Sequence, residues 1–390
     1  MRITNALARK ILNSNSNFTV EVEIRSNSNI FKGSAPAGES TSKYEIQDNL
    51  GINAGIEYLN SFLKEVKGLE ISTLQDIINL ESKIPRELIG SYSLALEYAL
   101  LKLVAKSNKK EVYELFNQSK IFPNVISKVI GGGVHALGKG MDFQEILVTT
   151  EGDFDKSLNT TLSVYKKVKE LLENEVGFYG GVDPEGGFIS NLSTYDSLKL
   201  VRKAIDEIKK LTGEDIRLGI DAAASQFFNE GYYHYKNKLY GKDKLNRGEQ
   251  VDAIIKLINE FDIFFVEDPV DQDYPEGYRE IKNKTKSIVI GDDLTATDIN
   301  RLERFKEDIS GALIKPNQQG LISKSIAFSN LIDKYNLVKV FSHRSEETNE
   351  YILADLAVGM NAKLIKIGIN RGERIEKINR LSEIWKRRKN

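Results

Sequence analysis

The second half of the chain alternates short apolar runs with charged segments of helical composition. DIFFVEDPV, SIVIGDD and GALIKPN are three such runs, and each stops on a charged residue. Apolar runs of this length, bounded by turn formers, are typical of strands that are buried on both faces in parallel sheets covered by helices. The pattern therefore predicts repeated βα units with Glu267, Asp292 and Lys315 at successive strand ends.

The same alternation of apolar runs and helical segments continues on both sides of this stretch. Upstream, DIRLGID ends on Asp221; downstream, LVKVFSHR reaches His343 and AKLIKIG carries Lys366. From Glu267 to Lys366 the strand-end residues recur about every 23 to 28 residues, which suits one βα unit per step. The carboxyl ends of parallel barrel strands meet at one mouth, where barrel enzymes keep their chemistry. We therefore expect these side chains to share a small volume.

The first third of the chain predicts a separate α+β domain. NALARKIL, TVEVEIRS and NIFKGSA alternate like strands of a small antiparallel sheet, and helical patterns follow up to residue 116. A chain of 390 residues exceeds the size at which one core usually keeps growing, and Pro123 interrupts the helical run. We predict a capping domain over residues 1–122 and a catalytic barrel over 123–390. The polar loop SAPAGESTSKYE is, by composition alone, more typical of an inert connection than of a site.

The predicted barrel opens with a hairpin and two helices. KVIGGGVHALGKGMDFQEILVTT predicts a β-hairpin that carries His135 and Glu145, and two amphipathic helices then flank a tight turn with Glu185. Residues 133–139 match the start of a phosphate-binding loop, GxxxxGK. However, Gly140 replaces the Ser or Thr that such a loop needs, and a strand-like run follows, so the hairpin is favoured. The order is ββαα, then βα units.

Composition excludes several classes of function. There are 55 basic and 56 acidic residues, so a formal charge of −1 gives no electrostatic case for nucleic acid as the main ligand. The absence of cysteine excludes disulfides and thiolate chemistry. No apolar run approaches the roughly 18 residues that a membrane span needs, and the N-terminus lacks a signal-like core. We expect a cytoplasmic protein without a membrane or nucleic-acid partner.

Three carboxylates at neighbouring strand ends predict a metal site. Asp221, Glu267 and Asp292 would repel one another unless a cation neutralised them, and hard oxygen donors suit Mg²⁺ better than Zn²⁺. Each acid alone could simply cap the following helix. Three in register with two lysines favour the metal site, since strand-end charges in barrels are often catalytic.

Lys315 and Lys366 are candidate bases at the same mouth. A neighbouring lysine and a divalent metal would lower the pKa of such an amine, although either lysine could instead form a plain salt bridge. With Glu185 or Glu145 as acid, the set predicts proton abstraction next to a metal-bound carboxylate. Arg344 and Ser345 are candidates for an anion clamp. The spacing of His135 does not distinguish a ligand from a buried core histidine.

These motifs together resemble the enolase family along nearly the whole chain. The matching stretches occur in the family's order and include ARKILNSNSNFTVEV, AGEST, GGGVHA, DPEGGF, GIDAAASQFF, VEDPVDQD, GDDLTATD, IKPNQQG, FSHRSEET and RGERIEKINRL. The resemblance implies an α+β cap on a (β/α)₈-type barrel that begins ββαα. It also implies a glycolytic, Mg²⁺-dependent lyase that interconverts 2-phosphoglycerate and phosphoenolpyruvate, acting as a homodimer or larger homo-oligomer.

The resemblance implies a role for each matching residue. Asp221, Glu267 and Asp292 look like ligands of a first Mg²⁺, and Ser40 like a ligand of a second that arrives with substrate. Lys315 would take the C2 proton. The other roles implied are contact with the substrate carboxylate by Lys366, protonation of the departing hydroxyl by Glu185 beside Glu145, phosphate binding by Arg344 and Ser345, and approach to the substrate by His135 and His343.

The chain also departs from the usual family pattern near the site, at Asn15, Ser16, Gly131, Pro184 and Glu346. Two alternatives follow. The chain could be a relative acting on another phosphorylated hydroxy acid, or a non-catalytic scaffold; the complete set of acids and lysines argues against the scaffold, since clustered charges are costly to keep.

Overall fold

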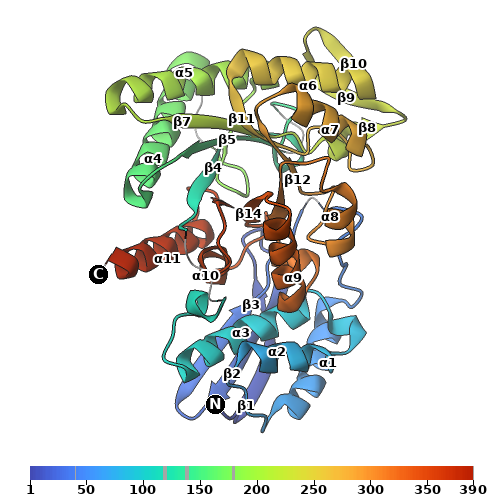
Figure 1. The fold of residues 1–390 in the computed structure, drawn as a ribbon, viewed down its shortest axis with the longest axis vertical. Coiled ribbons are helices and arrows are strands. Elements are labelled where there is room, and N and C mark those ends of the chain that lie inside the picture. Colours follow the sequence, from blue (N-terminus) through green and yellow to red (C-terminus); the bar gives the residue numbers. More distant parts are fainter. Residues whose placement is uncertain (40, 117–120, 137–139, 178–180, 390) are drawn as a thin grey trace.

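The structure is a computed structural model that describes residues 1–39, 41–116, 121–136, 140–177 and 181–389. Its N-terminal part is a three-stranded antiparallel sheet in the order β1 (Asn5–Leu12), β2 (Phe18–Ser26) and β3 (Asn29–Ser34), with helices α1 (Ile52–Val66), α2 (Leu74–Glu81) and α3 (Ser91–Ser107). In Figure 1 this part, coloured blue to cyan, lies at one end of the long axis. It is the predicted α+β cap.

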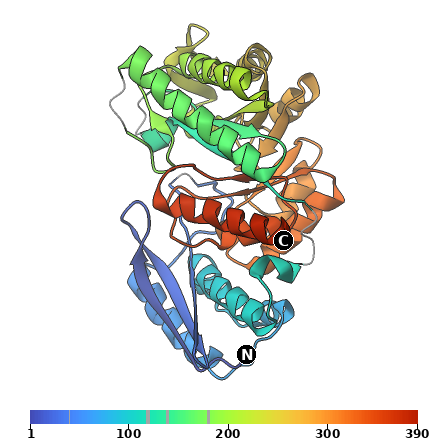
Figure 2. The same ribbon diagram turned by 90° about the vertical axis from the view of Figure 1, so that its left-hand side faces the viewer.

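Helix α3 joins the cap to the barrel. A Cβ atom on Gly33 of β3 would lie 2.3 Å from the carbonyl oxygen of Ala95, so the missing side chain lets α3 pack directly on the sheet (Figure 2). On its other side, the Ser93 hydroxyl donates to the carbonyl of Gly320 at 2.6 Å, and Glu97 accepts from the Ile322 amide at 2.7 Å. Thirteen of the 17 residues of α3 are buried in this position between the two parts.

The second part is a closed barrel of eight strands. Its order around the ring is β15-β14-β13-β12-β11-β7-β5-β4, and β15 pairs with β4 to close it. Strand β5 is antiparallel to both neighbours and the other pairs are parallel. The barrel strands are β4 (Asn124–Gly131), β5 (Glu145–Thr150), β7 (Ile216–Asp221), β11 (Ile263–Glu267), β12 (Ile288–Gly291), β13 (Gly311–Ile314), β14 (Val338–Ser342) and β15 (Leu364–Lys366).

The chain enters the barrel in the predicted order ββαα. After β4 and β5 come α4 (Phe154–Leu171) and α5 (Thr194–Thr212), with the two-residue strand β6 (Phe188–Ile189) between them at the rim. The remaining helices are α6 (Arg247–Phe261), α7 (Pro275–Lys284), α8 (Ile299–Phe305), α9 (Ile322–Lys334), α10 (Ile352–Gly359) and α11 (Gly372–Lys389). None of the described helices is long and apolar enough to cross a membrane.

An inserted sheet explains the long sequence step before Glu267. Strands β8 (Phe228–Asn229), β9 (Tyr232–Leu239) and β10 (Lys242–Asn246) form a separate antiparallel sheet between β7 and α6. In Figure 1 this sheet lies toward the end of the long axis opposite the cap.

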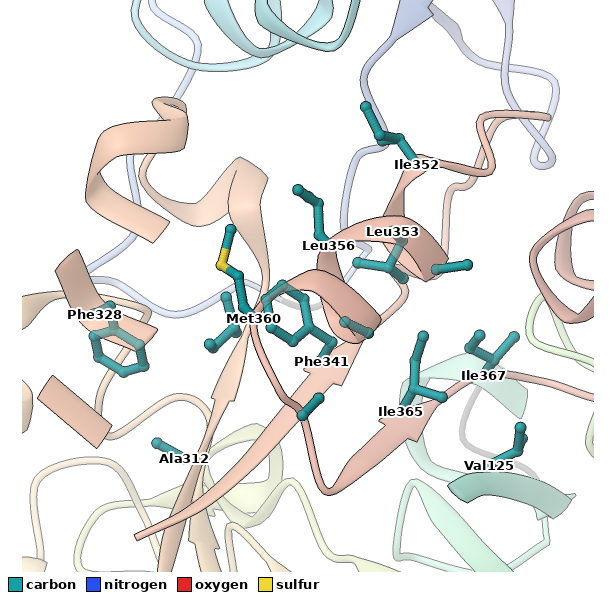
Figure 3. Packing of buried hydrophobic residues seen from close by; sticks show 14 of the residues in the cluster. Val125, Ala312, Phe328, Phe341, Ile352, Leu353, Leu356, Met360, Ile365 and Ile367 are labelled. Carbon is teal, nitrogen blue, oxygen red and sulfur yellow. The ribbon is translucent and has the colours of Figure 1, made fainter. Parts of the chain in front are cut away.

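The barrel is stabilised by one apolar layer inside the strands and another between the strands and the helices. Seven of the eight strands each contribute one apolar side chain to the interior layer. The eighth strand, β7, has Gly219 at the equivalent position, where it leaves room for Phe265 and Leu147. The cluster consists of Ile126, Leu147, Phe265, Ile290, Leu313, Val340 and Leu364. Side chains at the alternate positions of the strands face outward, toward the helices. Figure 3 shows Phe341 close to Met360 at the end of α10, and Ile365 on the side of Ile367 and Val125.

Phe341→Ala is expected to destabilise the protein by about 3–5 kcal/mol, because it removes a fully buried ring from the layer between strands and helices. The midpoint of urea unfolding, followed by circular dichroism, measures the change. Leu211→Ala is the matched control, since Leu211 is 79% exposed and its truncation should shift the midpoint little. Equal midpoints for the two variants would contradict this description of the core.

Candidate active site

One polar residue per strand surrounds the mouth of the barrel. Because side chains alternate along a strand, the residue two positions nearer the mouth from each interior apolar residue also points inward. Strand β5 runs the other way, so its first residue, Glu145, pairs with Asp221 at the end of β7. These inward residues form what we call the mouth ring: Lys128, Glu145, Asp221, Glu267, Asp292, Lys315, Ser342 and Lys366.

The Lys366 ammonium lies among three of the ring's carboxylates. Its Nζ is 2.9 Å from Asp221 Oδ2, 2.8 Å from Glu267 Oε2 and 3.2 Å from Glu145 Oε1. Burial lowers the pKa of Lys366, but Asp221, Glu145 and Glu267 outweigh it and hold the pKa well above its usual value. Lys366 is therefore a stable cation here.

Lys315 forms a close ion pair with Asp292, whose other oxygen accepts from Gln318 at 3.1 Å. Sequence reasoning expected a lowered pKa for Lys315. Burial does lower it, yet the charge of Asp292 more than offsets this, so the net pKa is raised. The expectation presupposed a divalent cation on the same carboxylates, which would cancel their effect on the amine.

The acid side of the mouth is formed by Glu145, Glu185 and His135. Donor atoms of all three lie within 4.8 Å of one another, and the Glu185 Oε2 atom is 3.3 Å from Nδ1 of His135. Burial, only partly countered by Lys366, raises the pKa of Glu145 to about 8. Burial also acts to raise the pKa of Glu185, but its close contacts, among them the buried ammonium of Lys128, overcome burial and place that pKa well below its usual value. Of these two neighbouring carboxyl groups, Glu145 is therefore the one that carries a proton at neutral pH.

The predicted anion clamp contacts the loop that leads from the cap. Arg344 makes a two-pronged ion pair with Glu45, at 2.7 and 3.2 Å, and the Ser345 hydroxyl accepts from the Glu39 amide at 2.7 Å. Ala37 also pairs with Glu346 through two backbone hydrogen bonds. The loop is therefore fixed across the mouth by the residues that follow β14. Ser40, the predicted ligand of a second metal, lies outside the described residues.

Two further buried side chains, His343 and Arg374, lie next to Glu185 and the turn that carries it. Nε2 of His343 is 3.9 Å from Glu185 Oε1, and burial followed by the charge of Arg374 lowers the pKa of His343 well below its usual value, so the ring is neutral. The buried guanidinium of Arg374 donates to the carbonyls of Pro184, Arg344 and Ser345 at 2.8 to 3.0 Å. It therefore ties the turn with Glu185 to the predicted clamp.

The donor set fits a hard divalent cation. Glu267 is fully buried, its Oε1 has no hydrogen-bond partner in the described part of the chain, and burial together with Asp221 raises its pKa well above the usual range. A bound Mg²⁺ would satisfy that oxygen and remove the repulsion.

Two other groups of three side chains have potential metal-binding atoms within 4.8 Å of one another among the described residues. One group is His135, Glu145 and Glu185, and the other is Asp268, Asp292 and Asp293. The predicted trio is spread by the two lysines, since Asp221 and Glu267 contact Lys366 while Asp292 contacts Lys315. Lys366 leaves Oε1 of Glu267 open to a metal, whereas both oxygens of Asp292 are engaged, one by Lys315 and the other by Gln318.

Sequence reasoning missed Lys128 and Asp183. Both are buried, and they form an ion pair of 2.5 Å beside Glu185. A signal for Lys128 was present, because the only charged residue of a strand as buried as NVISKVIG needs an oppositely charged partner. Asp183 begins the motif DPEGGF, but the sequence of a turn does not show which of its acidic side chains points into the site.

A closed β/α barrel whose strand ends carry converging carboxylates and lysines defines a barrel enzyme with a charged active site. Residues 119–387 match the sequence model described as "Enolase, C-terminal TIM barrel domain". Curated relatives named enolase include those of Sulfolobus acidocaldarius (32% identical, 98% of this chain and 95% of the relative covered), Methanosphaera stadtmanae (30%, 96% and 95%) and Pyrobaculum aerophilum (30%, 98% and 96%). The chain belongs to the enolase family.

Glu145→Gln is expected to stabilise the protein increasingly as pH rises. Folding moves the pKa of Glu145 from its usual 4.5 to about 8, so the stability it confers is complete below about pH 4.5 and is lost as pH rises through about 8. Glutamine does not ionise. With a chelator present, the advantage in Tm over the parent protein should be small at pH 5 and grow until about pH 8.

The control for this prediction is Glu151→Gln. Glu151 is exposed and directly follows β5, so its difference from the parent protein should not vary with pH over the same range. A pH-independent difference for Glu145→Gln would show that the carboxyl is already ionised in the folded protein at pH 5.

Proposed function

We propose that this chain catalyses the reversible dehydration of 2-phosphoglycerate to phosphoenolpyruvate with Mg²⁺. Relatives named enolase align with nearly its whole length, which supports the activity, and the mouth ring supplies the groups that the reaction needs. We also propose that it acts in the cytoplasm as a homodimer or larger homo-oligomer, as its family resemblance implies.

The observation that carries the proposal is the placement of a base and an acid on opposite walls of the mouth. Lys315 follows β13 and Glu145 begins β5, and these strands are four places apart in either direction around the closed ring of eight. Removing a proton from one carbon and a hydroxyl from the next requires groups that approach the substrate from two sides. Side chains projecting from facing strands meet this requirement.

Each side of the mouth then has a proposed task. Lys315 removes the C2 proton, and Lys366 binds the substrate carboxylate. Glu185 and Glu145 together supply the proton for the departing hydroxyl, with Glu145 as its resting place at neutral pH.

At the rim, Arg344 and Ser345 bind the phosphate, so the substrate must compete with Glu45 for the guanidinium. His135 and His343, both buried beside Glu185, approach the substrate from the acid side. A phosphorylated ligand would thereby loosen the loop contact that Arg344 makes in this structure.

Asp221, Glu267 and Asp292 would hold one Mg²⁺, and Ser40 is the candidate ligand for a second that arrives with substrate. Bound there, the metal stabilises the negative charge that builds up on the substrate carboxylate as the proton leaves. The protein's own part is to orient the carboxylate with Lys366 and to hold Lys315 near the proton.

Lys315→Ala is expected to lower kcat by about 100-fold or more, because it removes the proposed base. Formation of phosphoenolpyruvate, followed by ultraviolet absorbance with added Mg²⁺, measures it. Lys324→Ala, at an exposed lysine of α9, is the control and should retain parental turnover. Near-parental activity of a folded Lys315→Ala variant would refute the mechanism.

Mg²⁺ is expected to raise the Tm of the parent protein, since a ligand that binds the native state at 100 times its Kd adds about 2.7 kcal/mol. Glu267→Gln should abolish most of this shift, while Glu276→Gln on the exposed face of α7 should keep it. Thermal unfolding over a Mg²⁺ titration makes the comparison. An undiminished shift in Glu267→Gln would place the metal elsewhere.

A further inference from the structure

Lys128 of β4 is a buried cation for which the proposed reaction has no task. It is 1% exposed, and its Nζ is 2.5 Å from Asp183 Oδ2, 3.1 Å from Glu185 Oε2 and 2.9 Å from His135 Nδ1. It lies two residues beyond Ile126 on the same face of β4, as the other ring residues lie beyond their interior apolar neighbours. Lys128 is therefore part of the mouth ring.

We propose that Lys128 is a positioning residue: clamped by Asp183, its ammonium fixes the carboxylate of Glu185 and the tautomer of His135 on the acid side of the site. The inference rests on the proposed function for its effect on turnover. The placement of Glu185 and His135 by the Lys128 ammonium depends only on the observed contacts.

The surroundings are shaped around this cation. A Cβ on Gly131 would lie 1.9 Å from Asp183 Oδ2, and a Cβ on Gly187 would lie 2.9 Å from Cγ of Lys128, so both glycines leave room for the ion pair. The other oxygen of Asp183 accepts from the amides of Glu185 and Gly187 at 2.9 and 3.0 Å. The same carboxylate thus shapes the turn that presents Glu185 and anchors the lysine that contacts it.

Lys128 also determines the hydrogen bonding of His135. An ammonium group donates and cannot accept, so Nδ1 of His135 must accept from Lys128 and the ring proton sits on Nε2. Nε2 is buried and has no partner among the described residues, so this N–H is free to meet a substrate group. Without Lys128, Nδ1 could carry the proton and donate to Glu185.

Lys128 is the lasting positive charge beside Glu185 on that wall. Burial lowers its pKa, but Asp183, Glu185 and Glu145 outweigh burial and raise it, while His343 is neutral. The charged or titratable groups facing Glu185 are Lys128 of β4, His135 of the turn after it, Glu145 of β5, His343 after β14 and Lys366 of β15. Removing Lys128 should therefore raise the pKa of Glu185.

The plain alternative is a structural ion pair in which Lys128 only neutralises Asp183. Three variants separate the two roles: Lys128→Met, Asp183→Asn, and the double variant, which leaves neither charge unpaired. Lys339→Met is the matched control, because Lys339 is also a buried barrel lysine paired with one aspartate, Asp333, but on β14 away from the acids.

The readouts are Tm, the pH profile of kcat, and ¹⁵N spectra of the imidazoles, which are simple to assign because the chain has three histidines. For Lys128→Met we expect a lower Tm, a kcat lower by about 100-fold, and a changed ¹⁵N pattern for one imidazole, His135. The basic limb of the kcat profile, where the proposed acid pair loses its proton, should move to higher pH. Lys339→Met should lower Tm and leave both the profile and the spectra unchanged.

The double variant decides the matter. Positioning predicts that it recovers the part of the Tm loss that comes from an unpaired Asp183 carboxylate, but recovers neither kcat nor the His135 signal. Recovery of all three together, or a His135 spectrum unchanged in Lys128→Met, would overturn the inference. If the parent protein fails to turn over 2-phosphoglycerate, the proposed function fails, while Tm and the spectra still test the placement of His135 by Lys128.

Discussion

The arrangement of the mouth depends on the pairing of buried opposite charges. Removing an ion from water costs several kcal/mol, and only close counter-ions recover that cost. Each acid of the ring accordingly contacts a lysine, Asp221 and Glu267 through Lys366 and Asp292 through Lys315. The barrel makes this possible because eight strands direct one residue each to the same level. The charges then hold the site together before any ligand binds.

The departures from the usual family pattern lie next to compensating neighbours. Glu346 accepts hydrogen bonds from Asn13 and Asn17, which flank the turn containing Asn15 and Ser16. Gly131 faces the carboxylate of Asp183, directly before Pro184. Substitutions far apart in sequence thus form two local sets, one at the junction of cap and barrel and one at the acid side.

Much of this architecture could be predicted because its signals are local. Short apolar runs that stop on charged residues predicted Asp221, Glu267, Asp292 and Lys315 at strand ends, where the structure has them. The hairpin of β4 and β5 was predicted from the strand-like run that follows the glycine-rich stretch. The catalytic roles of these residues stay predictions, as does the domain boundary at residues 122–123.

What sequence reasoning missed depends on contacts between distant segments. The Arg344 pair with Glu45 joins residues from opposite ends of the chain, and the ion pair of Lys128 with Asp183 bridges a strand and a turn that give no sign of meeting. The raised pKa of Lys315 has another reason: the expectation of a lowered pKa assumed a divalent cation on the carboxylates, whereas here Lys315 is paired with Asp292. Ser40 falls outside the described residues, so its role is untouched.

The burial of α3 has a consequence for how the protein is made. This helix emerges from the ribosome long before Gly320 and Ile322, which cover one of its sides. The side of α3 that packs on β2 and β3 can be covered as soon as the cap folds, but the side that meets Gly320 and Ile322 stays exposed until the barrel has been made. Exposed surface of this kind favours aggregation, so the nascent cap is the aggregation-prone stage of this chain.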